Sequence, residues 1–209
     1  MAIRKDSVLG SFSGKLGGIV GYELNGQNVI RSLPVTAKRK PTALTLTNQR
    51  RMKAVSQFLR PLKHVIDFGY KNIAPKGSRV GAFQAAQSHT FRNAVDYGED
   101  NVPYVNPEKV LVFRGDLMPP PQLQVTREGN GIHVQWDNLS CRHEQGVLLI
   151  LAYAIEEKWF WFEEGGAKIS EGTFTWELHA GFLPDLHIYV GFYDILRDKL
   201  SDSVYGGCV

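Results

Sequence analysis

Short apolar segments in the second half of the chain constrain its fold most. Six of them follow one another between Leu123 and Tyr193, separated by Gly, Asn and Asp. Short strands at such regular spacing are typical of an antiparallel β-sandwich of roughly 90 residues. The expected strands cover residues 123–125, 132–136, 147–155, 158–162, 173–178 and 186–193.

A glycine-rich β-hairpin is expected near the N-terminus. Asn25-Gly26 favours a type I′ turn, because both residues tolerate positive φ angles. Residues 18–24 and 27–33 are the predicted arms of this hairpin. Five glycines between Gly10 and Gly21 leave few side chains for packing, so a close backbone neighbour or a binding partner is expected there.

Two helices are expected between the hairpin and the sandwich. Apolar residues at spacings of three and four predict a helix from Thr47, as its N-cap, to Gly69, and Pro61 is expected to kink or split it. A second helix is expected from Ser78 to about Tyr97. The predicted fold class is therefore α+β: a β-hairpin and a helical hairpin over residues 1–107, joined to a β-sandwich over residues 108–209.

Charge is distributed unevenly along the chain. Residues 1–100 hold 16 Lys/Arg and 6 Asp/Glu, whereas residues 101–209 hold 8 and 15, for a formal net charge of +3. Attraction between the two halves, within one molecule or between copies, would weaken with salt. The densest basic window, 38–63, is interpreted as a solvated helix face, a contact with an acidic subunit, or a phosphate-backbone site through Arg50, Arg51 and Lys53.

The C-terminal half resembles a fibronectin type III or immunoglobulin-like module. The resemblance rests on the proline-led strand at Pro121, on Ile132-x-Val134-x-Trp136, and on Tyr189 late in the chain. It implies a sandwich of that type.

The N-terminal half is similar to the opening of an uncharacterised bacterial family that is common in the Bacteroidota. The residues that carry this similarity are Gly10-Ser-Phe-Ser-Gly-Lys-Leu-Gly-Gly-Ile-Val-Gly, Asn25-Gly26 and Val29-Ile-Arg-Ser. The family is known only as a domain of unknown function. The similarity implies no enzymatic activity and no catalytic residues.

The sequence offers no strong signal for catalysis. Gly10 to Lys15 departs from a phosphate-binding loop in its spacing and is followed by leucine, and the six histidines show no metal-binding spacing. No cofactor, metal or small-molecule substrate is expected, and we predict a protein that is not an enzyme. No apolar run approaches the roughly 20 residues of a membrane span. Without an apolar segment behind the basic N-terminus, no classical signal peptide is expected, and the location stays open.

An aromatic strand, Trp159-Phe160-Trp161-Phe162, places large side chains on both of its faces. One face can pack into the sandwich. The other is expected against the helical hairpin, at a subunit interface, or as a platform for a sugar ring.

These features favour a structural protein that assembles with copies of itself, as a filament or as a virion-like or phage-derived particle. An extended arm can add a strand to a neighbour's sheet. The arm residues expected at that interface are Phe12, Leu16, Ile19, Val20 and Tyr22. The alternative is a binding module for carbohydrate, through the aromatic strand, or for nucleic acid, through the basic helix.

Overall fold

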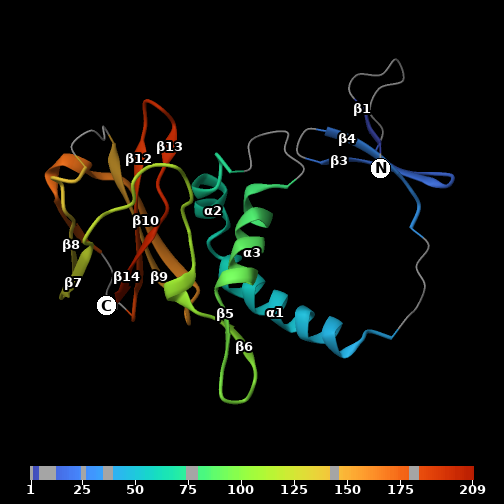
Figure 1. Ribbon diagram of the computed structural model, residues 1–209, viewed down its shortest axis with the longest axis horizontal. Helices are drawn as coiled ribbons and strands as arrows, with labels where there is room; N and C mark the ends of the chain where they lie inside the picture. Colours follow the sequence, from blue (N-terminus) through green and yellow to red (C-terminus); the bar gives the residue numbers. More distant parts are fainter. Residues whose placement is uncertain are drawn as a thin grey trace.

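The computed structural model describes residues 2–4, 13–24, 27–34, 40–73, 80–141, 146–178 and 184–209. Two antiparallel sheets form the largest part of it (Figure 1). The larger sheet has the order β10-β9-β12-β13, and β14 also pairs with β12; the smaller has the order β11-β8-β7. Their strands are β7 (Gln124–Glu128), β8 (Gly131–Gln135), β9 (Val147–Ala154), β10 (Trp159–Lys168), β11 (Thr173–Glu177), β12 (His187–Asp194), β13 (Lys199–Leu200) and β14 (Val204–Cys208).

The larger sheet is buried on both faces. Alternate side chains of β9 point in opposite directions, so Ile150 joins a cluster with Ile132 of the smaller sheet, while Leu151 joins a second cluster with Leu59 of the helices. All four side chains are fully buried. The body of the molecule therefore has three layers: helices, the larger sheet and the smaller sheet. Burial on both faces accounts for the nearly unbroken apolar sequence of β9.

Pro61 divides the first helical region, as predicted. Helix α1 (Ala43–Leu59) ends just before this proline, and α2 (Lys63–Gly69) begins just after it. Gly69 ends α2 as predicted; a Cβ atom there would lie 2.4 Å from the carbonyl oxygen of Val112.

The predicted N-cap of α1, Thr47, was wrong, because the N-cap lies five residues earlier, at Thr42. The side chain of Thr42 accepts a hydrogen bond from the backbone N–H of Thr45, which caps the helix there. The hydroxyl of Thr47 instead donates to the carbonyl of Ala43 inside the helix.

Helix α3 (Ala82–Asn93) is shorter than predicted. It ends at Asn93 because the next residues form β5 (Val95–Tyr97), which pairs with β6 (Pro103–Val105). The predicted start at Ser78 lies outside the described residues.

Buried tyrosine hydroxyls tie the layers together. Tyr153 donates a hydrogen bond to the carbonyl of Phe58 at the end of α1, over 3.1 Å, and Tyr189 donates to the carbonyl of Pro107 over 2.9 Å. Burial raises the pKa of Tyr153 to about 12, so its hydroxyl stays protonated as a donor at neutral pH.

The segment between the helices and the smaller sheet runs along the larger sheet. The backbone N–H of Val112 donates to the hydroxyl of Ser203, and that of Leu117 donates to the carbonyl of Leu200. Gly115 lies so close to Leu200 that a Cβ atom would be 1.9 Å from its carbonyl oxygen. This segment is part of the packed body.

The N-terminal strands form a separate sheet with the order β1-β4-β3-β2 (Figure 1). The predicted hairpin is confirmed: β3 (Ile19–Leu24) pairs with β4 (Gln27–Ser32), from Leu24 opposite Gln27 to Ile19 opposite Ser32. Its turn, Asn25-Gly26, lies outside the described residues. Strands β1 (Ala2–Arg4) and β2 (Gly14–Leu16) flank the hairpin and were not predicted. We call this four-stranded sheet the arm.

The chain is thus a mixed α/β protein with three helices and several antiparallel sheets in the part that the structure describes. In this coarse form the predicted fold class is confirmed.

Candidate interaction site

Apolar side chains lie on both faces of the arm. Residues paired across antiparallel strands share a face, so Val20 and Tyr22 lie with Val29 and Arg31, whose guanidinium is 5.4 Å from the centre of the Tyr22 ring. Leu16, Ile19 and Ile30 lie on the other face. Leu16 is 65% exposed and Ile19 is 38% exposed, while Val20 and Tyr22 are half-buried. Phe12, the fifth predicted arm residue, lies outside the described residues.

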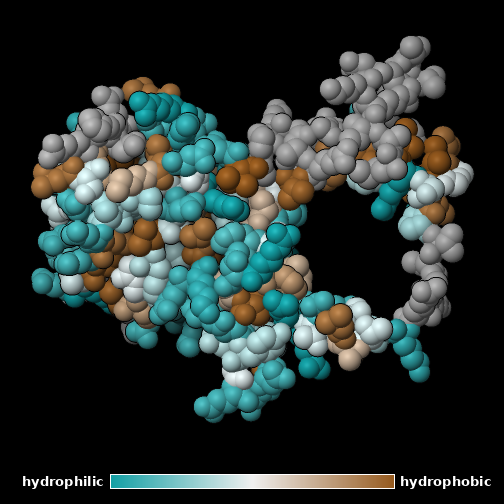
Figure 2. All heavy atoms as spheres, in the orientation of Figure 1, coloured by the Kyte–Doolittle hydropathy of each residue, from teal (hydrophilic) through white to brown (hydrophobic). Residues whose placement is uncertain are grey.

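The arm stands apart from the body. Neither hydrophobic cluster of the body includes an arm residue among the described parts of the chain. Figure 1 shows the arm at the far end of the molecule, with the helices between it and the larger sheet, and Figure 2 shows brown apolar side chains on its surface. An isolated sheet of this size is stabilised when a second layer covers its apolar residues.

The aromatic strand forms the first half of β10. Phe160 and Phe162 pack against the cluster that includes the helices, and the Phe162 ring centre lies 6.1 Å from that of Phe68 in α2. Trp161 packs on the opposite face, toward the smaller sheet. Trp159 is 66% exposed. Packing against the helices is the first of the three alternatives that the sequence left open.

The three basic residues singled out on α1 have different surroundings. Arg51 donates to the carbonyl of Phe91 over 3.0 Å and lies 4.2 Å from the centre of that ring, which fastens α3 to α1. Arg50 and Lys53 are exposed and border a shallow hollow with Val102 and Pro103. Arg51 is therefore held by a contact within the protein, whereas the charged groups of Arg50 and Lys53 face the solvent.

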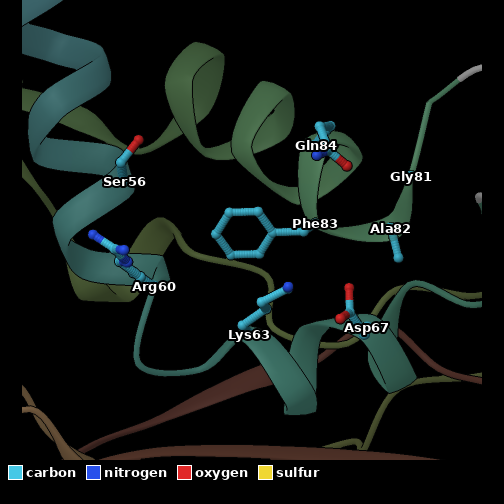
Figure 3. A pocket seen from close by; sticks show the side chains of 8 residues that line it. All are labelled: Ser56, Arg60, Lys63, Asp67, Gly81, Ala82, Phe83 and Gln84. Carbon is cyan, nitrogen blue, oxygen red and sulfur yellow. The ribbon is translucent and has the colours of Figure 1, made fainter. Parts of the chain in front are cut away.

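A pocket of about 610 Å³ lies between the three helices (Figure 3). Arg60, Lys63 and Asp67 line it around the Phe83 ring. Ser56, also in its wall, has its hydroxyl engaged by the side-chain amide of Gln87 over 3.0 Å. Among the described residues that line this pocket there is no histidine or cysteine.

The sequence did not predict a cluster of cysteine, histidine and aspartate at one end of the larger sheet. Pairing of β12 with β14 places Cys208 opposite His187, and both line a pocket with Asp185. Desolvation and the Asp185 carboxylate raise the pKa of the Cys208 thiol, which disfavours the nucleophilic thiolate. The Nδ1 atom of His187 lies 2.8 Å from the hydroxyl of Tyr205. This arrangement stabilises the strand pair rather than activating a thiol.

Burial of His187 predicts a loss of stability in mild acid. Burial lowers the pKa of His187 below its ordinary value of 6.5, while Asp185 opposes this shift less strongly. The unfolded chain therefore takes up a proton more readily, so the stabilising contribution is complete above about pH 6.5 and is lost as the pH falls toward the folded pKa. Urea unfolding between pH 7.5 and 5 measures how the free energy of unfolding depends on pH. The substitution His187→Gln should make that dependence weaker.

His89 should also contribute to the loss of stability in mild acid, because burial lowers the pKa of its imidazole as well. The double variant His89→Gln/His187→Gln should give a flatter profile than either single variant. An unchanged slope in the double variant would show that other groups cause the acid sensitivity.

The remaining sequence motifs lie partly outside the described residues. Within the described residues, no three His, Cys, Asp or Glu side chains converge in a way that could hold a metal ion. The glycine-rich segment before Ser13 and His143 lie outside the described residues. Among the helices that the structure describes, none is long and apolar enough to cross a membrane.

The fold and these surfaces define a three-layer α/β protein that carries a projecting β-sheet arm. The chain belongs to a family of unknown function, DUF6266, whose model matches residues 11–207. The expectation of a family of unknown function is thereby confirmed. Neither the curated proteins nor the solved structures provide a match.

Proposed function

We propose that this protein is a non-enzymatic assembly subunit whose N-terminal arm binds a neighbouring copy. The observation that carries the proposal is the arm itself: a single-layer sheet with Leu16 and Ile19 exposed, none of whose described residues joins the clusters of the body. Docking on another copy would cover those side chains. Such a head-to-tail contact joins two different surfaces, so it generates rings, filaments or particle shells.

The strand order supports assigning a fibronectin type III-like module to residues 108–209. Strands β7, β8 and β11 form one sheet, and β10, β9, β12 and β14 form the other, with a shared core of Ile132, Ile150 and Val190. Residues 1–107 would then supply the arm and the helices that cover the module. The Tyr189 hydroxyl bonds to Pro107, at the junction of these two regions.

Carbohydrate or nucleic-acid binding has less support from the surfaces. Of the four aromatic side chains of the strand, Trp159 alone is largely exposed, which leaves a narrow platform for a sugar ring. Arg51 is engaged by Phe91, which leaves Arg50 and Lys53 for a phosphate backbone. Self-assembly through the arm would cover two exposed apolar side chains, those of Leu16 and Ile19.

The decisive test of assembly is the variant Leu16→Asp. A carboxylate on the exposed face of β2 should abolish a contact that buries this position, because an unpaired charge in an interface is costly to desolvate. Light scattering after size exclusion, with negative-stain imaging, should show large particles for the native protein and monomers for the variant. Raising the salt concentration should weaken the native particles if charge attraction contributes.

Leu196→Asp is the matched control. Leu196 is 83% exposed in the turn between β12 and β13, on the body rather than the arm. This variant should assemble like the native protein. A monomeric native protein, or particles unaffected by Leu16→Asp, would refute the proposed function.

A further inference from the structure

We propose that the first half of β10, Trp159 to Glu164, is the surface that receives the arm. The occupant is β2 of a second copy, added as a further strand beside β10. This inference rests on the proposed function and names the receiving surface of that same contact.

Strand β10 is an open edge of the larger sheet. Within the described residues it pairs with β9 alone, in a regular ladder from Trp159 opposite Ala154 to Glu164 opposite Leu149. In an antiparallel ladder, alternate residues direct their N–H and C=O groups away from the partner strand. The outer side of β10 therefore offers backbone donors and acceptors to an incoming strand.

Only the first half of β10 is open in this way. The register becomes irregular between Glu164 and Lys168, where Gly165 has a φ of 86°. Beyond this point β10 bends toward the smaller sheet: a Cβ atom on Gly166 would lie 2.4 Å from the Phe174 ring of β11. The second half is thus closed by the chain itself, which limits the site to about six residues' length of regular strand.

The side chains of the open half are incompletely covered. Phe160, Trp161 and Phe162 are half-buried, whereas the β9 residues opposite them, Tyr153 to Leu151, are buried. The helices and the smaller sheet cover the aromatic side chains from above and below. A strand placed beside β10 would cover their outer flank and part of Trp159, which is the arrangement of strand addition.

The arm presents an edge that fits this site. Strand β2 is one of the two edge strands of the arm, and Gly14, Lys15 and Leu16 are all exposed. A Cβ atom on Gly14 would meet nothing within 4 Å, so the backbone there can approach another strand closely. In one molecule the helices lie between the arm and the larger sheet (Figure 1), which favours a second copy as the partner.

Charge also favours this pairing. Lys15 of β2 is an exposed cation, and Arg31 of β4 is another on the same face of the arm, with β3 between them. The receiving end of β10 carries Glu163 and Glu164. Glu156 and Glu157 lie exposed in the turn that leads into β10. Opposite charges at the rim of an interface set its register and speed association.

Cysteine cross-linking tests the site directly. A Cys208→Ser background removes the exposed native thiol, and Cys141 is buried. One protein carries Lys15→Cys, and a second carries Glu163→Cys or Glu164→Cys, which point to opposite faces of β10. Mixed under mild oxidation, they should form a disulfide-linked heterodimer on a non-reducing gel, because neighbouring strands bring Cα atoms within disulfide range.

Glu128→Cys, at the end of the edge strand β7, is the matched control. We expect at least about tenfold more heterodimer with the β10 variants than with this control, because docking raises the local thiol concentration. Equal cross-linking to β7, or no cross-linking while Leu16→Asp still disperses the particles, would overturn β10 as the receiver and leave the assembly function standing. If particles persist with Leu16→Asp and the cysteine pair forms no heterodimer, both proposals would be overturned.

Discussion

Leu151→Ala and Ile150→Ala are each expected to lower the free energy of unfolding by about 2–5 kcal/mol. The two residues are neighbours on β9, and both are fully buried, but they face opposite layers. In a sandwich with one solvated outer face, only one of the two substitutions would remove a core side chain. Here the helices form a second core, so each variant leaves a cavity. Urea denaturation monitored by circular dichroism measures both.

Thr126→Ala, at an exposed position of β7, is the control for these variants. Surface substitutions of this kind change the free energy of unfolding by about 0.5 kcal/mol or less. If Leu151→Ala were as mild as the control while Ile150→Ala remained costly, the helices would not cover the sheet in solution.

Gly115→Ala is expected to destabilise the protein by about 3 kcal/mol or more, at the upper end of the range for overpacking. The new Cβ atom would lie 1.9 Å from the carbonyl oxygen of Leu200, and that obstacle is backbone rather than a movable side-chain end. Either the connecting segment or β13 must shift. The shift would strain the hydrogen bond from Leu117 to Leu200. Thermal unfolding compares the variant with the native protein.

Gly98→Ala is the control for Gly115→Ala. It shows how much of the effect comes from losing a glycine and how much from the contact with Leu200. Gly98 is exposed, and the nearest atom to an added Cβ would be 3.9 Å away. This variant should be neutral or stabilised by up to about 1 kcal/mol, because alanine restricts the unfolded chain. Equal losses at positions 98 and 115 would contradict the close packing against Leu200.

Local patterns predicted the strands that carry enough side chains to show a pattern. The hairpin of β3 and β4 follows from its turn residues and flanking Ile, Val and Tyr, and the break at Pro61 follows from the missing N–H of proline. Strands β13 and β14 were missed. The first has two residues, and the second contains Gly206-Gly207, so neither has a readable alternation. Their positions depend on pairing with β12, a long-range contact.

The candidate site was predictable only in outline. Glycines and exposed apolar residues indicate that the N-terminal strands need a partner, but a sequence does not reveal that β2 and β10 are both sheet edges. Arg51 is a different case. It stands in a basic run for which a phosphate-backbone site was one of three interpretations, and the fold brings Phe91 from α3 to its guanidinium, a contact that the sequence does not show.

The helices of this protein bury their apolar side only when distant parts of the chain have come together. Phe58 meets Tyr153, 95 residues further along the chain, and Val112 meets Ser203, 91 residues further along. Contacts between such distant residues form slowly, on a scale of milliseconds to seconds. Until β9 and β12 are in place, the apolar stripe of α1 and α2 stays open to water and to other chains. During this interval the partly folded chain is prone to aggregate and is suited to binding by a chaperone.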